Sequence, residues 1–439
     1  MTPHHPHISR YQAILLALYR ALFTAGVILF VTCFPLWVFN SKRRKTLLKR
    51  LGWQQYPRLQ SSRRSPVWVH AVSIGELLSA GSLIESLRRE TGERPLFLSV
   101  STLSAFTLAT ERFNRFCDGC FYFPYDVPFA VSRCLERIDP ALVVFIETDI
   151  WPGFLADVRR KAVPCLLVNG RLSPESFRTY RAASALFKPA FNSFCSIYPQ
   201  SPGEAERFLA LGIDSDRLRT PGNLKFDAAL AIPDEAGLAA LREEFHILPD
   251  SPVLIAGSTH SGEEEILRSC FLRLRRKFSA LRLILVPRHP GRGSEVVKLF
   301  QDDGVDAILF SQLNRSIPVI VVDRLGYLSR LYALADIAVI GGSFVPKGGQ
   351  NPIEPAACGK PVLFGPDMHD FPDVSKWLLD AGGAVLAKDE DELYAACERL
   401  LTDRDTAAAM GRHGRRVVTA HQGTTERIVQ DVVSILSRI

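Results

Sequence analysis

Acidic residues are missing from the first 75 residues of this 439-residue chain. That stretch contains eleven Lys and Arg residues, and the first acid is Glu76. Because the whole chain has a formal net charge of +7, the part after residue 75 carries a net charge of −4. A nucleic-acid-binding protein is expected to carry cationic patches on its folded body. The charge distribution therefore argues against nucleic acid as a partner.

Paired cysteines and phosphate-loop signatures are also missing. The nine cysteines are scattered, and Cys117 and Cys120, at CxxC spacing, have no second pair to complete a zinc tetrahedron. No GKS or GKT run occurs, which excludes a P-loop. The chain is too long for one core and, at 47% hydrophobic residues, too apolar for disorder. We expect reduced thiols, no metal, and two globular domains with an accessory segment.

One long apolar run lies close to the N-terminus. Residues 21–39 contain no charged residue, and a helix of about 20 residues crosses a bilayer. Six cations follow at positions 42–50, which by the positive-inside rule places the remaining chain in the cytoplasm. A signal peptide fits less well, because no small-residue cleavage site follows and the charges come after the run. We expect a retained single-pass anchor within residues 1–50, with a shallow monotopic helix as the alternative.

After this segment, short apolar runs alternate with longer segments of helical period. Each run is nearly continuous in apolar character, as in parallel strands covered on both faces. The pattern predicts repeated βαβ units in an α/β protein with two Rossmann-like domains, at residues 51–232 and 248–439, the latter including C-terminal helices, joined by a linker at 233–247. The expected strands are 67–72, 95–101, 141–147, 165–169, 196–199, 253–257, 282–286, 318–322, 336–341 and 361–364.

The first candidate site follows the strand at 67–72. In such sheets ligands bind beyond the carboxyl ends of the strands. Ser73 is placed to cap the next helix, with Glu76 in its first turn. A carboxylate there can act as a general base if its pKa lies near the working pH. The alternative is a glutamate that only stabilises the helix N-terminus.

Three other strand ends of the first domain carry charged side chains. Glu147 lies in the run ETDIWP, where carboxylates and a tryptophan follow an apolar strand. Arg171 could clamp a carboxylate or phosphate in a bidentate way, or be an ordinary surface arginine. Lys225 could neutralise developing negative charge, or be a solvated loop lysine.

The second domain begins with a strand, a glycine turn and a helix. The run AGSTHSGEE, with Ser258 and His260, has small and hydroxyl residues that let backbone amides approach a phosphate. The run PRHP contains Pro287 and Arg288 and places a cation in a rigid loop at a strand end. Both runs predict contacts with an anionic ligand.

The segment GGSFVPKGGQNPIEPA at 341–356 is the most informative in this domain. The amides around Gly342 and Asn351 are expected to contact a phosphate, with Lys347 as a further candidate contact. They precede a helix expected to begin near Pro352. Glu354, one turn further, is placed to accept hydrogen bonds from two ribose hydroxyls, and the helix N-terminus favours a phosphate. The pattern indicates a nucleotide-sugar site.

Seven motifs together resemble the Kdo transferases, which attach 3-deoxy-D-manno-octulosonic acid (Kdo) to lipid A precursor in Gram-negative bacteria. They are HAVSIGE, ETDIWP, NGRLS, GNLKFD, AGSTHSGEE, PRHP and GGSFVPKGGQNPIEPA, in the family's order. The resemblance spans about residues 10–425. It implies a GT-B glycosyltransferase that inverts the anomeric carbon, with the acceptor lipid IVA in the first domain and the donor CMP-Kdo in the second. It also implies cytoplasmic domains anchored to the inner membrane.

The resemblance assigns roles by position. Glu76 matches the catalytic base, and Glu147 and Lys225 match transition-state stabilisers. The CMP contacts match Pro287, Arg288, Leu325, Gly326, Tyr327, Asn351, Pro352, Ile353 and Glu354. Tyr327 departs from the family's usual Glu, which leaves backbone contacts there. Milder departures are Asp149, Gly153 and Gly170, where Glu, Asn and Ala are usual.

Two other functions remain as alternatives at this point. One is a membrane-associated GT-B transferase that uses a UDP-sugar. The other is a catalytically inactive, membrane-tethered binding protein, against which the presence of Glu76, Arg288 and Glu354 argues. No DxD-type pair lies beside the glycine-rich loop, so we expect turnover without a metal or other cofactor. The sequence carries no signal for an oligomeric state.

Overall fold

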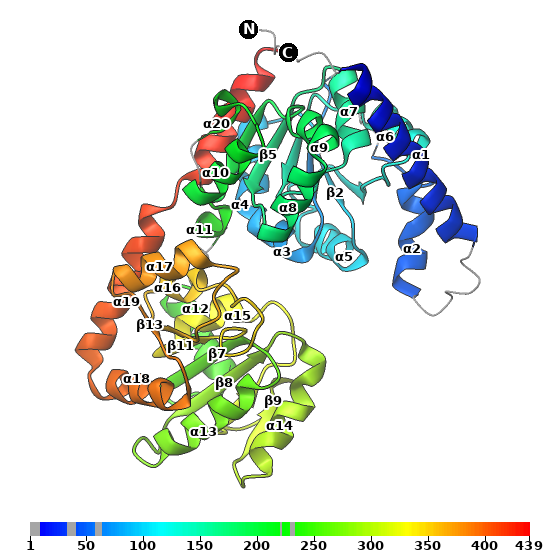
Figure 1. Cartoon of the computed structure of the whole chain (residues 1–439). Helices are drawn as coiled ribbons and strands as arrows, with labels where there is room; N and C mark the ends of the chain where they lie inside the picture. The colour runs from blue at the N-terminus through cyan, green and yellow to red at the C-terminus, as the bar shows by residue number, and fades with distance from the viewer. Residues whose placement is uncertain (1–8, 33–40, 58–63, 220–221, 229–232) are drawn as a thin grey trace. The chain divides into compact units, whose positions relative to one another are not determined.

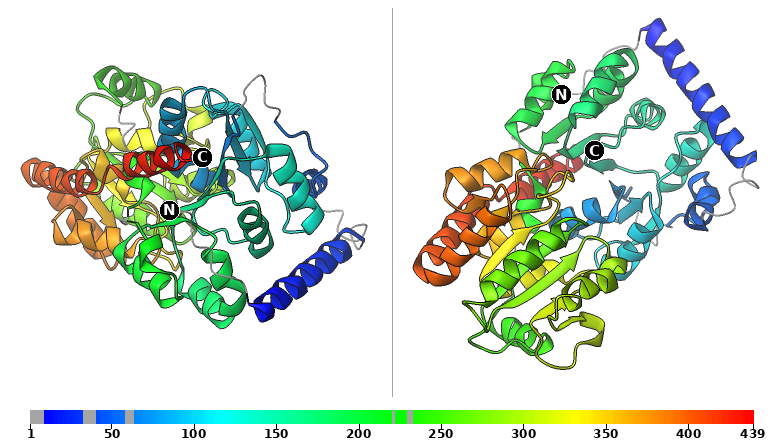
Figure 2. Two further views of the ribbon diagram at one scale, coloured as in Figure 1. Left: turned by 90° about the horizontal axis from the view of Figure 1, so that it is seen from above. Right: turned by 60° about the horizontal axis from the view of Figure 1, so that its bottom comes forward.

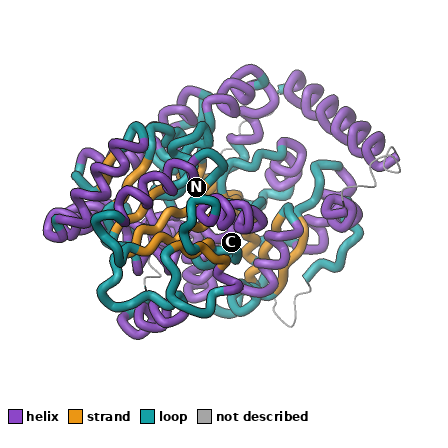
Figure 3. The backbone as a smooth tube through the Cα atoms, turned by 90° about the horizontal axis from the view of Figure 1, so that it is seen from below, coloured by secondary structure: helices purple, strands orange, loops and turns teal. Residues whose placement is uncertain are grey.

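The computed structural model describes residues 9–32, 41–57, 64–219, 222–228 and 233–439. The chain forms two compact units. The first contains Met1–Ala228 and Gln422–Ile439, and the second contains Ala229–His421. Each unit is a parallel sheet with helices packed against it (Figures 1 and 3). The expected α/β architecture of two Rossmann-like domains is therefore confirmed.

The first unit is built on a six-stranded sheet in the order β3-β2-β1-β4-β5-β6. Alternate residues of the central strand β1 enter separate cores, with Val67 and Val69 in one and Trp68 in the other. The strands are β1 Val67–Ala71, β2 Leu96–Val100, β3 Gly119–Tyr122, β4 Leu142–Ile146, β5 Cys165–Gly170 and β6 Ser196–Pro199. The helices are α1 Arg10–Thr32, α2 Ser41–Arg50, α3 Ile74–Ser79, α4 Gly81–Thr91, α5 Leu103–Arg112, α6 Pro128–Ile138, α7 Pro152–Arg160, α8 Pro174–Ala182, α9 Ser184–Phe191, α10 Pro202–Ala210, α11 Leu224–Ala228 and α20 Thr424–Leu436.

The second unit is built on a seven-stranded sheet in the order β13-β12-β11-β7-β8-β10-β9. The strands are β7 Val253–Thr259, β8 Arg282–Pro287, β9 Ala307–Leu309, β10 Val319–Val321, β11 Ile337–Ile340, β12 Val362–Phe364 and β13 Ala384–Leu386. The helices are α12 Glu235–Glu244, α13 Glu263–Arg275, α14 Gly293–Gln301, α15 Leu328–Leu331, α16 Ile353–Ala357, α17 Pro372–Asp380, α18 Glu390–Thr402 and α19 Arg404–Ala420.

All ten strands expected from the sequence are present, within a few residues of their expected ends. Three strands were not expected, namely β3, β9 and β13, and each lies at an edge of its sheet. An edge strand pairs on one side only and is less enclosed than a central strand. Its apolar run is therefore shorter, which removes the signal that identified the others.

The expected C-terminal boundary is wrong, because residues 422–439 belong to the first unit. Helix α20 lies beside α4 (Figure 1), and its Ile428 and Val432 are buried in the core beneath β1. The carboxylate of Asp227 also accepts hydrogen bonds from the amides of Gly423 (2.8 Å) and Thr425 (2.6 Å). Helix α20 is therefore held in place by Asp227 of α11.

The segment 233–247 was expected to be a linker, but the structure folds it into the second unit. It contains α12, and Leu241, Phe245 and Ile247 are buried together with Val253 and Ile255 of β7. These contacts make it part of the core of the second unit. Apolar residues at helical spacing in this segment explain the difference.

Helix α1 is displaced from the expected span of 21–39, because it begins at Arg10 and includes Arg20. Residues 33–39 of that span lie outside the described residues. The helix is long and apolar enough over Arg10–Phe30 to cross a membrane, and it lies at the periphery of the first unit (Figure 2). It contacts α7 and α9. A stripe of exposed apolar residues is formed by Tyr11, Ile14, Leu18, Leu22 and Leu29.

Candidate functional site

The sheet of the first unit brings Glu76 and Glu147 to the same edge. Strands β1 and β4 are parallel neighbours, with His70 opposite Phe145. The chain leaves β1 through a short turn into α3, which carries Glu76, and Glu147 directly follows β4. The two residues expected from the sequence to act together therefore lie beyond the carboxyl ends of adjacent strands.

Glu76 is held at the beginning of α3 by its own turn. Its Oε2 atom accepts a hydrogen bond from the amide of Val72 (2.6 Å), and its Oε1 accepts one from the Ser73 hydroxyl (3.0 Å). Ser73 caps α3, as expected. The glutamate therefore does stabilise its turn, as the alternative interpretation predicted. Burial, followed by the negative charge of Glu147, nevertheless raises the pKa of Glu76 to about 7, which suits a general base near neutral pH.

Glu147 has a strained backbone. Its φ of 61° lies in the left-handed region that residues with a side chain rarely adopt. Its amide donates to the carbonyl of Val168 (2.8 Å), which continues the pairing of β4 with β5. Strain of this kind concentrates at functional sites, where the surrounding structure holds it in place.

Asp149 adds a third carboxylate to this edge, and its negative charge also raises the pKa of Glu76. Its Oδ2 atom accepts hydrogen bonds from Trp151 Nε1 (2.8 Å) and contacts His70 Nε2 (3.1 Å). His70 is fully buried, stacks on Phe123 and contacts the Ser99 hydroxyl through Nδ1 (2.9 Å). The sequence reasoning assigned no role to His70. A histidine inside an otherwise apolar strand was the available signal.

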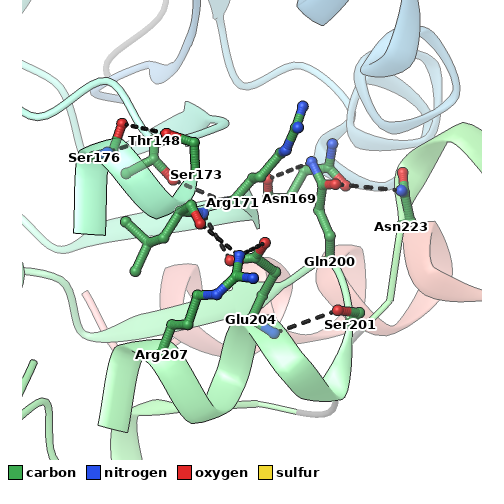
Figure 4. A network of polar contacts seen from close by, with 11 residues as sticks. Thr148, Asn169, Arg171, Ser173, Ser176, Gln200, Ser201, Glu204, Arg207 and Asn223 are labelled. Atoms are coloured by element: carbon green, nitrogen blue, oxygen red, sulfur yellow. Dashed lines mark hydrogen bonds and ion pairs between the residues drawn. The ribbon is translucent and has the colours of Figure 1, made fainter. Parts of the chain in front are cut away.

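Arg171 lies in a loop stabilised by a polar network (Figure 4). Its amide donates to the Thr148 hydroxyl (2.9 Å). The carboxylate of Glu204 receives the amide of Leu172 (2.7 Å) and the Arg207 guanidinium (2.8 Å). The Arg171 side chain extends away from the Glu204–Arg207 pair in Figure 4. The network therefore orders the loop around Arg171.

Lys225 is positioned through Asn169, a residue that the sequence reasoning missed. Asn169 is fully buried at the end of β5 with a φ of 61°. Its Oδ1 atom accepts a hydrogen bond from the amide of Leu224 (3.2 Å), at the start of α11, which carries Lys225. The strand end next to Glu147 is therefore linked to the helix of Lys225.

The edge of the second unit is cationic. Burial lowers the pKa of His260, and the nearby charges of His289, Lys347, Arg288 and Arg292 lower it further. Ser258, at the end of β7, has a strained φ of 59°. The amide of Arg288, which follows Pro287 of β8, donates to Thr259 (3.0 Å) and joins the two strand ends. The expected contacts His260, Arg288 and Lys347 thus lie together around a site suited to an anion.

The Gly342 amide, expected to contact a phosphate, donates to a carboxylate of the protein in this structure. The amides of Gly342 (2.7 Å), Ser343 (3.0 Å) and Phe344 (3.0 Å) all donate to the buried carboxylate of Glu263. The His260 amide donates to the same carboxylate (2.9 Å). Glu263 therefore occupies the donors of this loop and fixes its shape. Its position within an acidic run hid this role from sequence reasoning.

The segment from Asn351 to Glu354 forms a compact turn into α16. The Asn351 side chain accepts a hydrogen bond from the Ile353 amide (3.1 Å) and donates to Glu354 Oε1 (3.0 Å). Pro352 is the N-cap, so α16 begins one residue later than expected. Glu354 is half-buried and held by Asn351, which orients its carboxylate before any ligand binds.

Tyr327 is engaged within its own unit. Its hydroxyl donates to Glu244 (3.0 Å), and its ring packs on Phe310 with 4.8 Å between centroids. Gly326 has a φ of 86° and Leu325 is 75% exposed. The tyrosine therefore joins α12 to the segment that carries Phe310.

Comparison with known proteins identifies relatives of this chain. A sequence profile described as 3-deoxy-D-manno-octulosonic-acid transferase (kdotransferase) matches residues 45–228. The 3-deoxy-D-manno-octulosonic acid transferase of Haemophilus influenzae is 30% identical over 91% of this chain and 94% of that protein. The enzyme of the same name from Aquifex aeolicus is 32% identical over 77% of this chain and 87% of that protein.

A solved structure shares the fold. The UDP-GlcNAc 2-epimerase from Neisseria meningitidis bound to UDP-GlcNAc has a TM-score of 0.62 at 13% identity. The match covers 84% of this chain and 100% of that chain. At this identity the likeness supports the fold alone.

Proposed function

The chain belongs to the Kdo transferase family, glycosyltransferases of lipopolysaccharide synthesis, and from this premise we propose that it transfers Kdo from CMP-Kdo to a hydroxyl of lipid IVA with inversion at the anomeric carbon. The observation that carries the proposal is Glu76, a carboxylate with a pKa of about 7 at the carboxyl edge of the first sheet. A base of this pKa can accept a proton from a sugar hydroxyl near neutral pH.

Glu76 acts in this proposal as the proton acceptor. It takes the proton of the acceptor hydroxyl as that oxygen attacks the anomeric carbon of Kdo from the face opposite CMP. The new glycosidic bond forms while the bond between the anomeric carbon and the CMP phosphate breaks. Glycosyl transfer passes through a transition state with positive charge on the sugar. In this proposal Glu147 stabilises that positive charge, and Lys225 neutralises negative charge that develops in the transition state.

The second unit binds the donor in this proposal. Arg288 and Lys347 attract the phosphate and the Kdo carboxylate, and both lie close to His260, whose lowered pKa favours a neutral imidazole. The carboxylate of Glu354, oriented by Asn351, accepts hydrogen bonds from the ribose. A monophosphate leaving group needs less neutralisation than a diphosphate, so these cations suffice without a metal ion.

Association with the inner membrane is proposed through α1, whose exposed apolar stripe suits a lipid surface. A single crossing, with both units in the cytoplasm, was expected from the sequence. Tyr19 and Arg20, however, bind Asp126 (2.9 Å) and Asp157 (2.8 Å) of the folded body. Because the middle of α1 is bound to the folded body, we propose that α1 lies along the membrane surface and does not cross the bilayer.

The two arrangements place Leu22 at different depths. A fluorophore on a Leu22→Cys variant should be quenched more strongly by lipids labelled near the headgroup if α1 lies in the membrane plane. Stronger quenching by lipids labelled near the bilayer centre would instead support the crossing helix.

The central test is a reaction of purified protein with CMP-Kdo and lipid IVA, followed by mass spectrometry of the lipid. The expected product is heavier by one or more Kdo residues, with release of an equal amount of CMP. The spectrum also counts the sugars added. Turnover of a UDP-sugar without turnover of CMP-Kdo would overturn the proposal.

A further inference from the structure

We propose that α1 is part of the catalytic edge as well as a membrane element, with Tyr19, Arg20 and Phe23 as positioning residues for the segment 147–153. Through this segment they hold Asp149 in place beside Glu76. The inference rests on the function proposed for Glu76. All the contacts that carry it lie within the first unit.

The first contact is at the beginning of α7. The buried carboxylate of Asp126 accepts hydrogen bonds from the amides of Gly153 (2.8 Å) and Phe154 (2.6 Å), and from the Tyr19 hydroxyl of α1 (2.9 Å). A Cβ atom at position 153 would lie 2.6 Å from Asp126 Oδ1, so only glycine leaves room for this carboxylate. Asp126 therefore joins α1 to the start of α7 directly.

The second contact is an ion pair. The Arg20 guanidinium binds Asp157 of α7 (2.8 Å) and donates to the carbonyl of Gly153 (2.8 Å). The side chains are 24% and 7% exposed, so the pair is largely screened from water. Removing one partner of such a pair leaves an uncompensated buried charge. Arg20 thus holds α7 at both its first and its second turn.

The third contact leads to the carboxylates. Phe23 meets Trp151 edge to face, with 5.9 Å between ring centroids. The indole of Trp151 donates to Asp149 (2.8 Å), which also contacts His70 (3.1 Å). A continuous chain of contacts therefore runs from α1 through Trp151 to Asp149. Asp149 is held between a buried histidine on β1 and a tryptophan that α1 supports.

Loss of α1 docking should therefore loosen the whole segment 147–153, which carries the proposed stabiliser Glu147 as well as Asp149. A misplacement of about 1 Å at such a site can lower the rate up to about 100-fold. The effect differs from loss of membrane binding, because it persists when the acceptor is presented in detergent.

The test compares variants on the two faces of α1. Arg20→Ala and Phe23→Ala remove docking contacts, and Tyr19→Phe removes one hydrogen bond. Arg10→Ala is the matched control, since Arg10 is exposed on the same helix and lies outside the apolar stripe. CMP release is measured with CMP-Kdo and detergent-dispersed lipid IVA, so that no membrane is required. Vesicle flotation and thermal melting are measured in parallel.

The expected result is a fall in kcat of about tenfold for Arg20→Ala and Phe23→Ala, with an unchanged KM for CMP-Kdo and unchanged flotation. Tyr19→Phe should show a smaller fall in kcat without a change in melting temperature, which keeps the test decisive if Arg20→Ala unfolds. Arg10→Ala should match the wild-type protein in kcat, KM and melting temperature.

Unchanged kcat in Phe23→Ala and Tyr19→Phe would overturn the inference, as would a loss confined to flotation. The proposed function fails separately, if Glu76→Gln remains active in the same assay.

Discussion

The carboxyl edges of the two sheets use their carboxylates in opposite ways. In the first unit, Glu76 is half-buried and accepts hydrogen bonds from its own turn, and its pKa is raised to about 7. In the second unit, Glu263 and Glu264 are each 1% exposed and turn inward. Glu263 receives four backbone amides, and Glu264 binds the Thr259 hydroxyl (2.9 Å) and Arg292 (2.9 Å).

The difference shows how one strand–turn–helix pattern supports two chemistries. Where the loop amides are satisfied by an internal carboxylate, the side chains left outward are the cations Arg288 and Lys347, and the edge suits an anion. Where the glutamate is half-buried beside other carboxylates, burial and then their negative charge raise its pKa, and the edge suits a base. The position of one acid in the first helical turn selects between the two.

The largest effect is expected for Glu76→Gln. Glutamine keeps the size and a carbonyl acceptor for the Val72 amide but cannot accept a proton. Transfer should fall by about 1,000-fold, while binding of CMP to the second unit is unchanged. Kdo transfer and CMP binding are measured on the same preparation, with exposed Glu85→Gln as control. Substantial transfer by Glu76→Gln would remove this residue from the mechanism.

Glu263→Gln tests the inward-turned glutamate of the second unit. A neutral amide offers one oxygen to four backbone donors, so the loop at 342–344 loses much of its support. We expect a loss of about 3 kcal/mol in the free energy of unfolding and a raised KM for CMP-Kdo. Denaturant unfolding is the measurement. Glu265→Gln, exposed on the same helix, should be near neutral; an equal loss there would contradict the role of Glu263.

The same Glu76→Gln variant should be more stable than the wild-type protein at pH 8. Ionised Glu76 is destabilising in the folded chain, because its pKa is raised from 4.5 to about 7. Replacement should add about 2 kcal/mol at pH 8, and nothing below about pH 4.5, where the group is protonated in both states. Thermal melts across this range measure the difference. A gain that did not depend on pH would point to packing instead.

Arg288→Ala tests the cationic edge. Loss of one charge-assisted contact should raise the KM for CMP-Kdo about tenfold and weaken its dependence on salt. Initial rates are measured over a range of donor and salt concentrations. Arg276→Ala removes an exposed cation that precedes β8, at the opposite edge of the sheet, and should leave the KM unchanged. Equal effects from both variants would show a general charge effect.

The smallest effect is expected for Asp149→Asn. The change removes a negative charge that raises the pKa of Glu76, while the amide oxygen still accepts from Trp151. The acid limb of the pH profile of kcat/KM should therefore move to lower pH, by about half a unit. Asp139→Asn, exposed before β4, is the control. A shift to higher pH would contradict the proximity of the two carboxylates.

The central strands and the residues at their carboxyl ends could be predicted because they are local features. A buried parallel strand needs a continuous apolar run, and the turn after it carries the functional side chains. Glu76 and Arg288 were identified in this way. The edge strands β3, β9 and β13 were missed because one-sided pairing demands less apolar sequence.

The hydrogen-bond partners of single polar groups could not be predicted from the sequence in the same way. Gly342 was expected to offer its amide to a ligand, but Glu263, 79 positions away, accepts it. Asn169 gave no signal, and His70 gave only its polarity within an apolar strand, because the partners of both residues come from distant segments. Hydrogen bonding across the sheet decides which donors remain available, and this depends on the whole fold.

The sequence by itself determined the α/β class, the two parallel sheets and the acid-free N-terminal segment that ends at Glu76, since each follows from local hydrophobicity and charge. Only the tertiary structure decided that α20 returns to the first unit, that Glu263 turns inward, and that α1 binds the body through Tyr19 and Arg20. The physical reason is burial. A side chain is buried by partners that lie far away along the chain, and the free energy of a charged or polar group depends on those partners.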